Sequence, residues 1–179
     1  MNRIHTSKFL SLVLRHQPEV IDVVLDAEGW LEIDLLIANA NARGKQLSLE
    51  LIHEVVANCD KQRFALSEDG LRIRANQGHS VSGVELKLEP VEPPETLFHG
   101  TVANFLDSIR TQGLQSRSRH HVHLSGDIET ASKVGQRRGK PIIISVDSGR
   151  MHGDGFAFFR SANGVWLTDT VPPEYLSLP

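Results

Sequence analysis

The chain has 179 residues, of which 40% are hydrophobic and 23% are charged, with 14 Gly, 8 Pro and one Cys. This is an ordinary globular composition, which excludes a disordered, collagen-like or coiled-coil chain. The single cysteine, Cys59, excludes an internal disulfide, and no apolar run approaches the roughly 20 residues that cross a bilayer. The first 16 residues lack the features of a signal peptide. We therefore expect a cytoplasmic protein with no membrane partner and no evident obligate protein partner.

The net charge of -3 gives no indication of a polyanionic partner, but the charges are unevenly distributed. Between Arg110 and Lys140 there are seven Lys or Arg residues and three His residues, against the two acids Asp127 and Glu129. A dense local cluster of cations is suited to binding a few phosphates at one place rather than a long nucleic-acid backbone. A solvated basic surface is the alternative interpretation.

The first predicted element is a helix. Apolar residues recur at helical spacing between Phe9 and Leu14, with Thr6 and Ser7 as the expected caps, and Pro18 ends the helix. The two polar residues at its end are Arg15 and His16.

Two further helices are predicted at residues 34–42 and 48–58, each opened by a capping residue, and Gly44 closes the first. A hairpin follows, with strands at 63–66 and 71–75 around an Asp69-Gly70 turn. Alternation directs one set of side chains toward the core: Phe64, Leu66, Leu71 and Ile73. The opposite set is Arg63, Arg72 and Arg74. Three helices and a hairpin favour a winged helix.

A winged helix raises the possibility of DNA reading by the third helix. That helix has no Lys or Arg, and Glu50, His53, Glu54 and Asp60 occupy or end it. Because Glu50, Glu54 and Asp60 would approach a phosphate-lined groove, the sequence argues against duplex recognition.

The second half is predicted to combine short strands with small helices, so the fold class is α+β. The expected strands are 96–99, 122–125, 142–147, 156–160 and 165–168. The expected helices are 102–112, ended by Gly113, and 128–138, capped by Asp127 and ended by Gly139. The segment 84–95 is rich in Pro and Glu and predicts a linker between residues 1–83 and 96–179.

No familiar catalytic motif is present. His121 and His123 lie on one face of a predicted strand, but no further ligand follows at metal-site spacing, so we expect no metal. There is no GxGxxG, Walker, GxSxG or HExxH motif. What remains is a set of cations, histidines and glycines at the ends of predicted elements, where sites are usually built. Taken singly, each has an ordinary structural explanation as a capping, paired or core residue.

Taken together, these residues lie in seven segments that resemble one family. The segments are SKFLSLVLRHQP at 7–18, LDAEGW at 25–30, DKQRFAL at 60–66, IRANQGHS at 73–80, LFHGT at 97–101, RHHVHLS at 119–125 and NGVWLT at 163–168. They resemble the signature segments of the RNA 2′-phosphotransferase family, whose members remove the 2′-phosphate at tRNA splice junctions. The chain departs from the family at residues 21–23, where glycine is common, and at the variable position His120.

The resemblance implies an N-terminal winged-helix lobe, which binds RNA phosphate, and a C-terminal ADP-ribosyltransferase-like lobe. It implies NAD⁺ as a consumed co-substrate and an RNA with a 2′-phosphate as substrate. The family's catalytic set falls on Arg15, His16, Arg63 and Arg119, which are expected to meet in a cleft between the lobes. The dinucleotide site falls on His99, Gly100, Thr101, Gly113, His123, Leu124, Ser125 and Val165. Val165 stands where many relatives of the superfamily have a catalytic glutamate.

The reaction so implied has two steps. The RNA 2′-phosphate first displaces nicotinamide, and the ribose O2″ then attacks phosphorus, giving 2′-OH RNA and ADP-ribose 1″,2″-cyclic phosphate. One alternative is an ADP-ribosyltransferase that modifies a terminal nucleic-acid phosphate or a protein and stops after the first step. Another is a non-catalytic winged-helix regulator, although the basic recognition-helix residues that it needs are missing.

Overall fold

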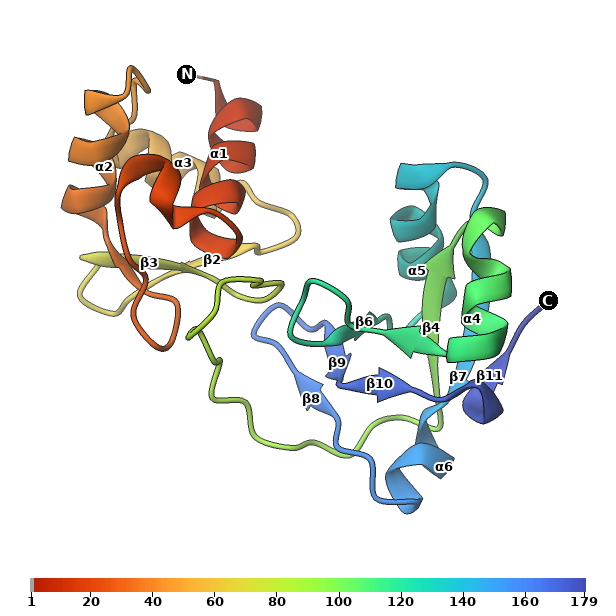
Figure 1. Ribbon diagram of the computed structural model, residues 1–179. Coiled ribbons are helices and arrows are strands. Elements are labelled where there is room, and N and C mark those ends of the chain that lie inside the picture. The colour runs from red at the N-terminus through yellow and green to blue at the C-terminus, as the bar shows by residue number, and fades with distance from the viewer. Residues whose placement is uncertain (1) are drawn as a thin grey trace. The chain divides into compact units, whose positions relative to one another are not determined.

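The computed structural model describes residues 2–179 and shows a mixed α and β structure (Figure 1). Within these residues there are six α-helices and four small antiparallel sheets. The chain divides into two compact units, Met1–Lys87 and Leu88–Pro179. The division falls inside the segment 84–95, where the sequence predicts a linker. Val84 is buried in the core of unit 1, whereas the Val91 amide donates to the Phe158 carbonyl of unit 2.

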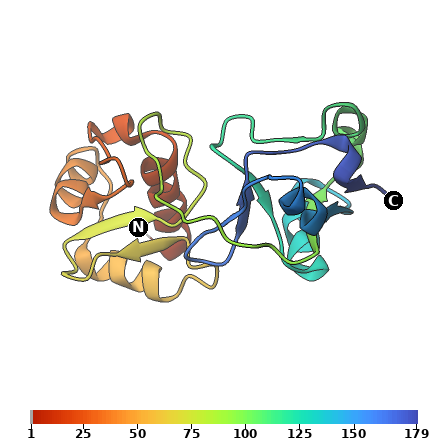
Figure 2. The ribbon, with the colours of Figure 1, turned by 90° about the horizontal axis from the view of Figure 1, so that it is seen from below.

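Unit 1 consists of three helices and a three-stranded sheet. The helices are α1 (Arg3–Arg15), α2 (Ile33–Ala42) and α3 (Leu49–Ala57), with a 3₁₀ turn at Pro18–Ile21. The sheet has the order β1 (Leu31–Glu32), β3 (Arg72–Ala75), β2 (Phe64–Leu66). α1 packs on α3 and β3, and α3 also contacts β2 (Figure 2). The core between them includes Leu10, Val13, Leu14, Leu36, Ile52, Phe64 and Ile73.

The first helix begins earlier than the sequence predicts. Asn2 is its N-cap, and the Asn2 side chain accepts a hydrogen bond from the His5 amide at 2.9 Å. The prediction of Thr6 and Ser7 as caps is wrong, because Thr6 is buried inside the helix and its hydroxyl donates to the Asn2 carbonyl. The predicted end before Pro18 is confirmed, and proline opens the 3₁₀ turn that follows.

The second helix and the hairpin also differ in detail from the prediction. α2 begins at Ile33 after Glu32, which makes no side-chain capping bond, so Asp34 lies in the first turn instead of capping the helix. Ser48 does cap α3, as expected. Leu71 was expected to face the core but is 62% exposed, because it lies at the end of the turn, where its amide donates to Asp69.

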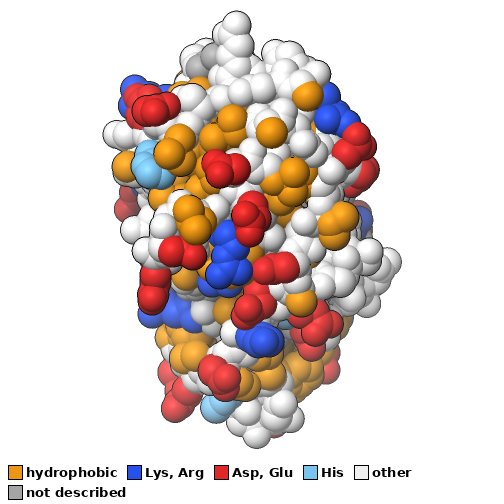
Figure 3. Space-filling view, turned by 90° about the vertical axis from the view of Figure 1, so that its left-hand side faces the viewer, with side chains coloured by type: hydrophobic (Ala, Val, Ile, Leu, Met, Phe, Trp, Pro, Cys, Tyr) orange, Lys and Arg blue, Asp and Glu red, His pale blue; other side chains and the backbone are white. Residues whose placement is uncertain are grey.

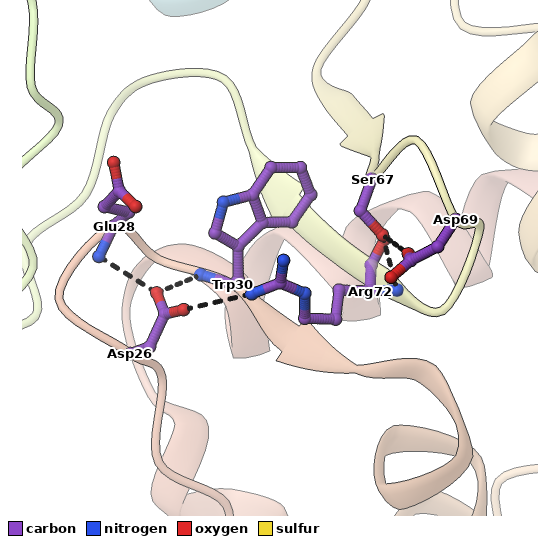
Figure 4. A network of polar contacts seen from close by, with 6 residues as sticks. All are labelled: Asp26, Glu28, Trp30, Ser67, Asp69 and Arg72. Atoms are coloured by element: carbon purple, nitrogen blue, oxygen red, sulfur yellow. Dashed lines mark hydrogen bonds and ion pairs between the residues drawn. The ribbon is translucent and has the colours of Figure 1, made fainter.

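A polar network holds the hairpin to the turn before β1 (Figure 4). The Asp26 carboxylate accepts from the amides of Glu28 and Trp30, and its other oxygen lies 3.8 Å from the Arg72 guanidinium. Arg72 and Arg74 also stack on the Trp30 ring, at 5.5 and 4.5 Å from its centroid. Both arginines therefore point away from the core, as the alternation predicts. The network fixes the strand β3 beside which Arg63 lies.

Unit 2 contains three small sheets and three helices. Its sheets are β11 (Leu176–Ser177), β7 (Ile142–Asp147), β4 (Thr96–Thr101); β6 (Val122–Leu124), β9 (Trp166–Thr168), β8 (Phe159–Arg160); and β10 (Thr170–Val171), β5 (Leu114–Gln115). Its helices are α4 (Leu106–Gln112), α5 (Ile128–Gly135) and α6 (Ser148–Gly153). α5 packs against β4 and β7 (Figure 1). Reciprocal backbone bonds between Phe98 and Ser125 join β4 to the end of β6.

The predicted elements of unit 2 are present, but several are shorter or divided. The expected helix at 102–112 is a 3₁₀ turn (Ala103–Phe105) followed by α4, and the one at 128–138 is α5 followed by a 3₁₀ turn (Gln136–Arg138). The expected strand at 156–160 is reduced to Phe159–Arg160. The prediction missed α6, whose bounds are Ser148–Gly153, and two-residue strands such as β5. No helix within residues 2–179 is long and apolar enough to span a membrane.

Replacing Leu14 by alanine tests the packing of α1 in unit 1. Leu14 is fully buried, whereas Leu12 on the same helix is 37% exposed. We expect Leu14→Ala to lower the free energy of unfolding by about 2–5 kcal/mol, because a cavity is left in the core. Leu12→Ala should cost much less. Denaturant unfolding of both variants measures this difference, and equal losses would contradict the placement of the helix.

Candidate functional site

The end of α1 places Arg15 and His16 next to each other. The Ser80 amide donates to the Arg15 carbonyl at 2.8 Å, and the Ser80 hydroxyl lies 2.9 Å from His16 Nδ1. The Arg15 guanidinium donates to the Arg63 carbonyl at 3.5 Å. A helix end leaves carbonyls that need donors, and here the segment after β3 supplies one. Three separate parts of unit 1 therefore meet at Arg15, His16 and Arg63.

Arg63 itself is held from its own side. Its backbone amide and its Nη1 each approach the Cys59 sulfur, at 3.4 and 3.5 Å, so the thiol accepts from both. The backbone amide of Asn76 donates to the Arg63 carbonyl, and the side-chain amide of Asn76 donates to the Gln62 carbonyl. These bonds fix the backbone of Arg63 at the start of the hairpin, where it lies beside the end of α1.

A groove of about 830 Å³ in unit 1 is lined in part by two of the predicted catalytic residues, His16 and Arg63. One wall is the exposed side of α1, and the other is the end of α3 with the turn that follows it. Its lining is Arg3, Ile4, Ser7, Lys8, Ser11, Leu12, His16, Val55, Asn58, Cys59, Asp60, Lys61 and Arg63. Four of these residues are Lys or Arg and one is an acid, so the lining is strongly basic on a chain whose net charge is -3.

This basic groove contrasts with other parts of the surface. On the face in Figure 3, acidic side chains are more widely spread than basic ones, and apolar side chains lie between them. A phosphate is attracted where cations converge and is attracted little where the charges alternate. The groove is therefore the better candidate for an anion in unit 1.

In unit 2, Arg119 lies in a basic cluster. Its Nη1 is 3.0 Å from His123 Nδ1. Burial lowers the pKa of the Arg119 guanidinium, and the charges of Arg138 and Arg137 lower it further. Within residues 2–179, no carboxylate forms a salt bridge with these three arginines. Because like charges repel, an anion bound here would relieve the unfavourable interaction.

The hydrogen bonds around His123 and His99 define their ring protons. A guanidinium can only donate, so His123 Nδ1 accepts from Arg119, and in the neutral ring Nε2 carries the proton. His99 Nδ1 lies 3.2 Å from the His123 carbonyl, which can only accept, so His99 Nδ1 carries a proton. Burial lowers the His99 pKa, which favours the neutral ring with an acceptor at Nε2. This nitrogen is suited to accept from a hydroxyl.

Two of the glycines predicted to bind the dinucleotide have a packing role. A Cβ on Gly100 would collide with the carbonyl of Ala131 in α5, so glycine lets the helix lie close to β4. Gly113 ends α4 with φ of +71°, and a Cβ there would meet the Val171 carbonyl. The fold alone therefore requires glycine at both positions, whatever binds beside them.

The other predicted dinucleotide residues differ in accessibility. Leu124 is 2% exposed and Thr101 is 7% exposed, so the Leu124 side chain belongs to the core and can offer a ligand little beyond its backbone. Ser125 exchanges backbone bonds with Phe98 and lies next to the end of β6. Val165 precedes β9 and exchanges bonds with Ser161. The structure brings His99, His123 and Ser125 together around β4 and β6, whereas Gly113 lies beside β10.

Other residues with a role in the site were not assigned one by the sequence. Ser80 belongs to the segment 73–80 that resembles the family, but it is not among the predicted catalytic or dinucleotide residues; in the structure it lies against Arg15 and His16 within unit 1. The sequence assigns Cys59 no role beyond the exclusion of an internal disulfide, but in the structure its sulfur contacts Arg63. The separation of four residues between Cys59 and Arg63 does not by itself indicate this contact, because the contact depends on the turn between them. His121 lies 3.7 Å from the Asp169 carboxylate and against Phe159.

Comparison with known proteins agrees with the resemblance seen in the sequence. A family model described as RNA 2′-phosphotransferase, Tpt1 / KptA family, matches residues 1–170. A "Probable RNA 2′-phosphotransferase" of Rhodopirellula baltica is 66% identical over 176 residues, covering 98% of this chain and 96% of the relative. Proteins of the same name from Hahella chejuensis and Pseudomonas fluorescens are 58% and 56% identical, covering 96% of this chain and 92% and 94% of their own. The chain belongs to the RNA 2′-phosphotransferase family.

Replacing Gly100 by alanine separates packing from ligand binding. The added methyl group would meet the Ala131 carbonyl, and we expect the free energy of unfolding without ligand to fall by about 1–3 kcal/mol, as overpacking does. Gly153→Ala is the matched control, because nothing lies within 4 Å of its Cβ position. Thermal unfolding without nucleotide measures both variants. Unchanged stability of Gly100→Ala would mean that α5 does not need this close approach.

Protonation of His99 should contribute to loss of stability in acid. Because burial lowers its pKa in the folded state, the unfolded chain binds this proton at higher pH than the folded chain does. Stability is then lost as pH falls below the unfolded pKa of about 6.5. We expect His99→Gln to show a smaller loss of unfolding free energy between about pH 7 and 5 than the wild type. His53→Gln, at an exposed position of α3, is the control, and an unchanged pH dependence in His99→Gln would refute the assignment.

Proposed function

We propose that this chain is an NAD⁺-dependent RNA 2′-phosphotransferase that removes an internal 2′-phosphate of the splice-junction type. The observation that carries the proposal is the convergence of Arg15, His16 and Arg63 at one end of a basic groove. A guanidinium presents several donors in a plane that matches phosphate oxygens, so paired arginines hold a dianionic phosphate better than lysines do. The names of the family and of the relatives give the coarser part of this proposal, an RNA 2′-phosphotransferase activity.

Two finer assignments of fold belong to this proposal. Unit 1 has three helices and an antiparallel sheet with a hairpin, which supports a winged-helix lobe. Unit 2 has small antiparallel sheets with His99 and His123 on neighbouring strands, which supports an ADP-ribosyltransferase-like lobe. On this reading unit 1 binds the RNA phosphate and unit 2 binds the dinucleotide.

The chemistry of unit 2 fits NAD⁺ as a consumed co-substrate. Arg119, Arg137 and Arg138 are cations suited to the pyrophosphate or to the transferred phosphate. The acceptor nitrogen of neutral His99 is suited to a ribose hydroxyl. At Val165 there is no carboxylate, and a carboxylate there would repel a phosphate dianion, which is already a nucleophile. NAD⁺ supplies the anomeric carbon that this nucleophile attacks.

The reaction that we propose has two balanced steps. In the first, a 2′-phosphate oxygen of the RNA bonds to the anomeric carbon of the nicotinamide ribose, and the bond to nicotinamide breaks. In the second, the ribose O2″ bonds to phosphorus, its proton leaves, and the bond from phosphorus to the RNA 2′-oxygen breaks. That oxygen takes up a proton and becomes a 2′-hydroxyl. The other product is ADP-ribose 1″,2″-cyclic phosphate.

The residues of the site have distinct tasks in this scheme. Arg15, Arg63 and Arg119 bind the phosphate oxygens and stabilise the charge that develops at phosphorus. His16 donates a hydrogen bond to the phosphate or the proton that the leaving 2′-oxygen takes up. Ser80 is a positioning residue, because its hydroxyl contacts the His16 ring at Nδ1.

Incubation with NAD⁺ and a short RNA with one internal 2′-phosphate tests the proposal. We expect the wild type to give 2′-OH RNA, nicotinamide and the cyclic phosphate, resolved by mass spectrometry. Arg63→Ala and Arg119→Ala should slow the second step roughly 10²- to 10³-fold, the usual loss for one charge-stabilising donor, and accumulate ADP-ribosylated RNA. Arg43→Ala in unit 1 and Arg110→Ala in unit 2 remove cations that are paired with Asp22 and Asp107, and they are the controls.

The other outcomes of this experiment are equally informative. A wild type that stops at stable ADP-ribosylated RNA would establish the transferase alternative instead. Wild-type rates in both Arg63→Ala and Arg119→Ala would remove the phosphate-binding assignment. Absence of nicotinamide release with any RNA would refute the proposed function.

A further inference from the structure

We propose that the basic groove of unit 1 binds the RNA strand that flanks the 2′-phosphate, an inference that rests on the proposed function. The groove begins beside His16 and Arg63 and continues along α1 to Arg3 and Ile4. Binding of the phosphate itself needs only the first end of this groove. The cations along the rest of the groove are therefore not needed to bind the 2′-phosphate.

The spacing of the groove residues follows from the geometry of α1. Arg3, Ser7, Lys8, Ser11 and His16 recur at helical spacing on its exposed side. At 1.5 Å per residue, the distance along the axis from Arg3 to His16 is about 20 Å. One strand of stacked nucleic acid advances about 3.4 Å per nucleotide, so this length takes up to about six nucleotides, and fewer if the strand is extended.

The chemistry of the lining matches a single strand of RNA. Lys8 and Lys61 are exposed on opposite walls, and Asp60 is the only acid among the described residues of the lining. Arg3, at the far end, lies 3.4 Å from the Glu54 carboxylate. Ile4 and Leu12, 68% and 37% exposed, give apolar surface for sugars and bases between the cations. Sites for single strands combine cations that follow the backbone with side chains on which bases lie, which are usually aromatic and here are the aliphatic Ile4 and Leu12. A polyanion with planar apolar groups is the occupant that this lining favours.

Continuity with the phosphate-binding residues distinguishes an RNA strand from an acidic protein segment. His16 and Arg63 belong both to the groove and to the proposed phosphate site. A strand whose 2′-phosphate lies at these residues must leave the site along some path, and the groove offers a basic path that starts there. The flanking nucleotides then add affinity without touching the reacting atoms.

The test compares a long and a minimal substrate. The variants are Lys8→Gln with Lys61→Gln, and the control is Lys45→Gln, which removes an exposed lysine of unit 1 outside the groove. The substrates are a 2′-phosphorylated dinucleotide and a decanucleotide with the same junction. We expect the double variant to raise KM for the decanucleotide about tenfold with kcat within twofold, and to leave KM for the dinucleotide unchanged. Each lost phosphate contact should reduce the slope of log KM against log salt by about 0.7.

A binding measurement keeps this inference separate from the proposed function. Fluorescence anisotropy of a labelled decanucleotide without a 2′-phosphate, in the absence of NAD⁺, should show the same tenfold weakening in the double variant and none in Lys45→Gln. If the wild type processes neither substrate, the proposed function fails while the anisotropy still tests the groove. If the decanucleotide binds and reacts equally well in the double variant and the control, the groove does not bind RNA. Equal loss on both substrates would place the lysines in the phosphate site instead and would also overturn the proposal.

Discussion

The site of unit 1 depends on how the end of α1 is satisfied. A helix that ends at Arg15 leaves carbonyls without intrahelical donors. Here the Ser80 amide bonds to the Arg15 carbonyl, while the Arg15 side chain bonds to the Arg63 carbonyl. The same bonds that stabilise the helix end thus bring the segment after β3 and the start of the hairpin to one place. Arg15, His16 and Arg63 are held together by one backbone bond, one bond from the Arg15 side chain to a carbonyl, and the contact of the Ser80 hydroxyl with His16.

The cations of the two units are arranged differently, which suggests different tasks. In unit 1 the Arg63 guanidinium is held by the Cys59 sulfur and the backbone around it by Asn76, and no carboxylate of the described residues forms a salt bridge with it. In unit 2 the charges of Arg137 and Arg138 act on Arg119 and, after its desolvation, lower its pKa further. All three side chains are exposed, but like charges close together still repel. An anion bound among them would reduce this repulsion and would therefore stabilise unit 2.

The sequence predicted the elements whose signals are local and failed where tertiary contacts decide. Pro18, Ser48 and the Asp69-Gly70 turn place the ends of α1, α3 and the hairpin correctly. The hydroxyl of Thr6 is typical of a cap and predicts one there, but Asn2, further upstream, is the residue that caps the helix. The strand β5 has two residues, too few to show a period, and forms only because β10 pairs with it. The contacts of Arg63 with Cys59 likewise depend on a turn that no spacing reveals.

For the predicted dinucleotide residues, resemblance to the family does not separate a role in packing from a role in ligand binding. Gly100 matches a family motif, and a close approach of ligand to backbone would explain it, yet α5 already fills the space above it. His99 is different. The fold fixes its Nδ1 on the His123 carbonyl, so its Nε2 is the acceptor that a ligand can use. A residue whose identity is fully explained by packing, such as Gly100, gives no independent support for a ligand. A residue that the fold holds with a donor or acceptor available for a ligand, such as His99, does give such support. By this criterion His99 and Arg119 support the proposed dinucleotide and phosphate binding more strongly than the glycines or Leu124 do.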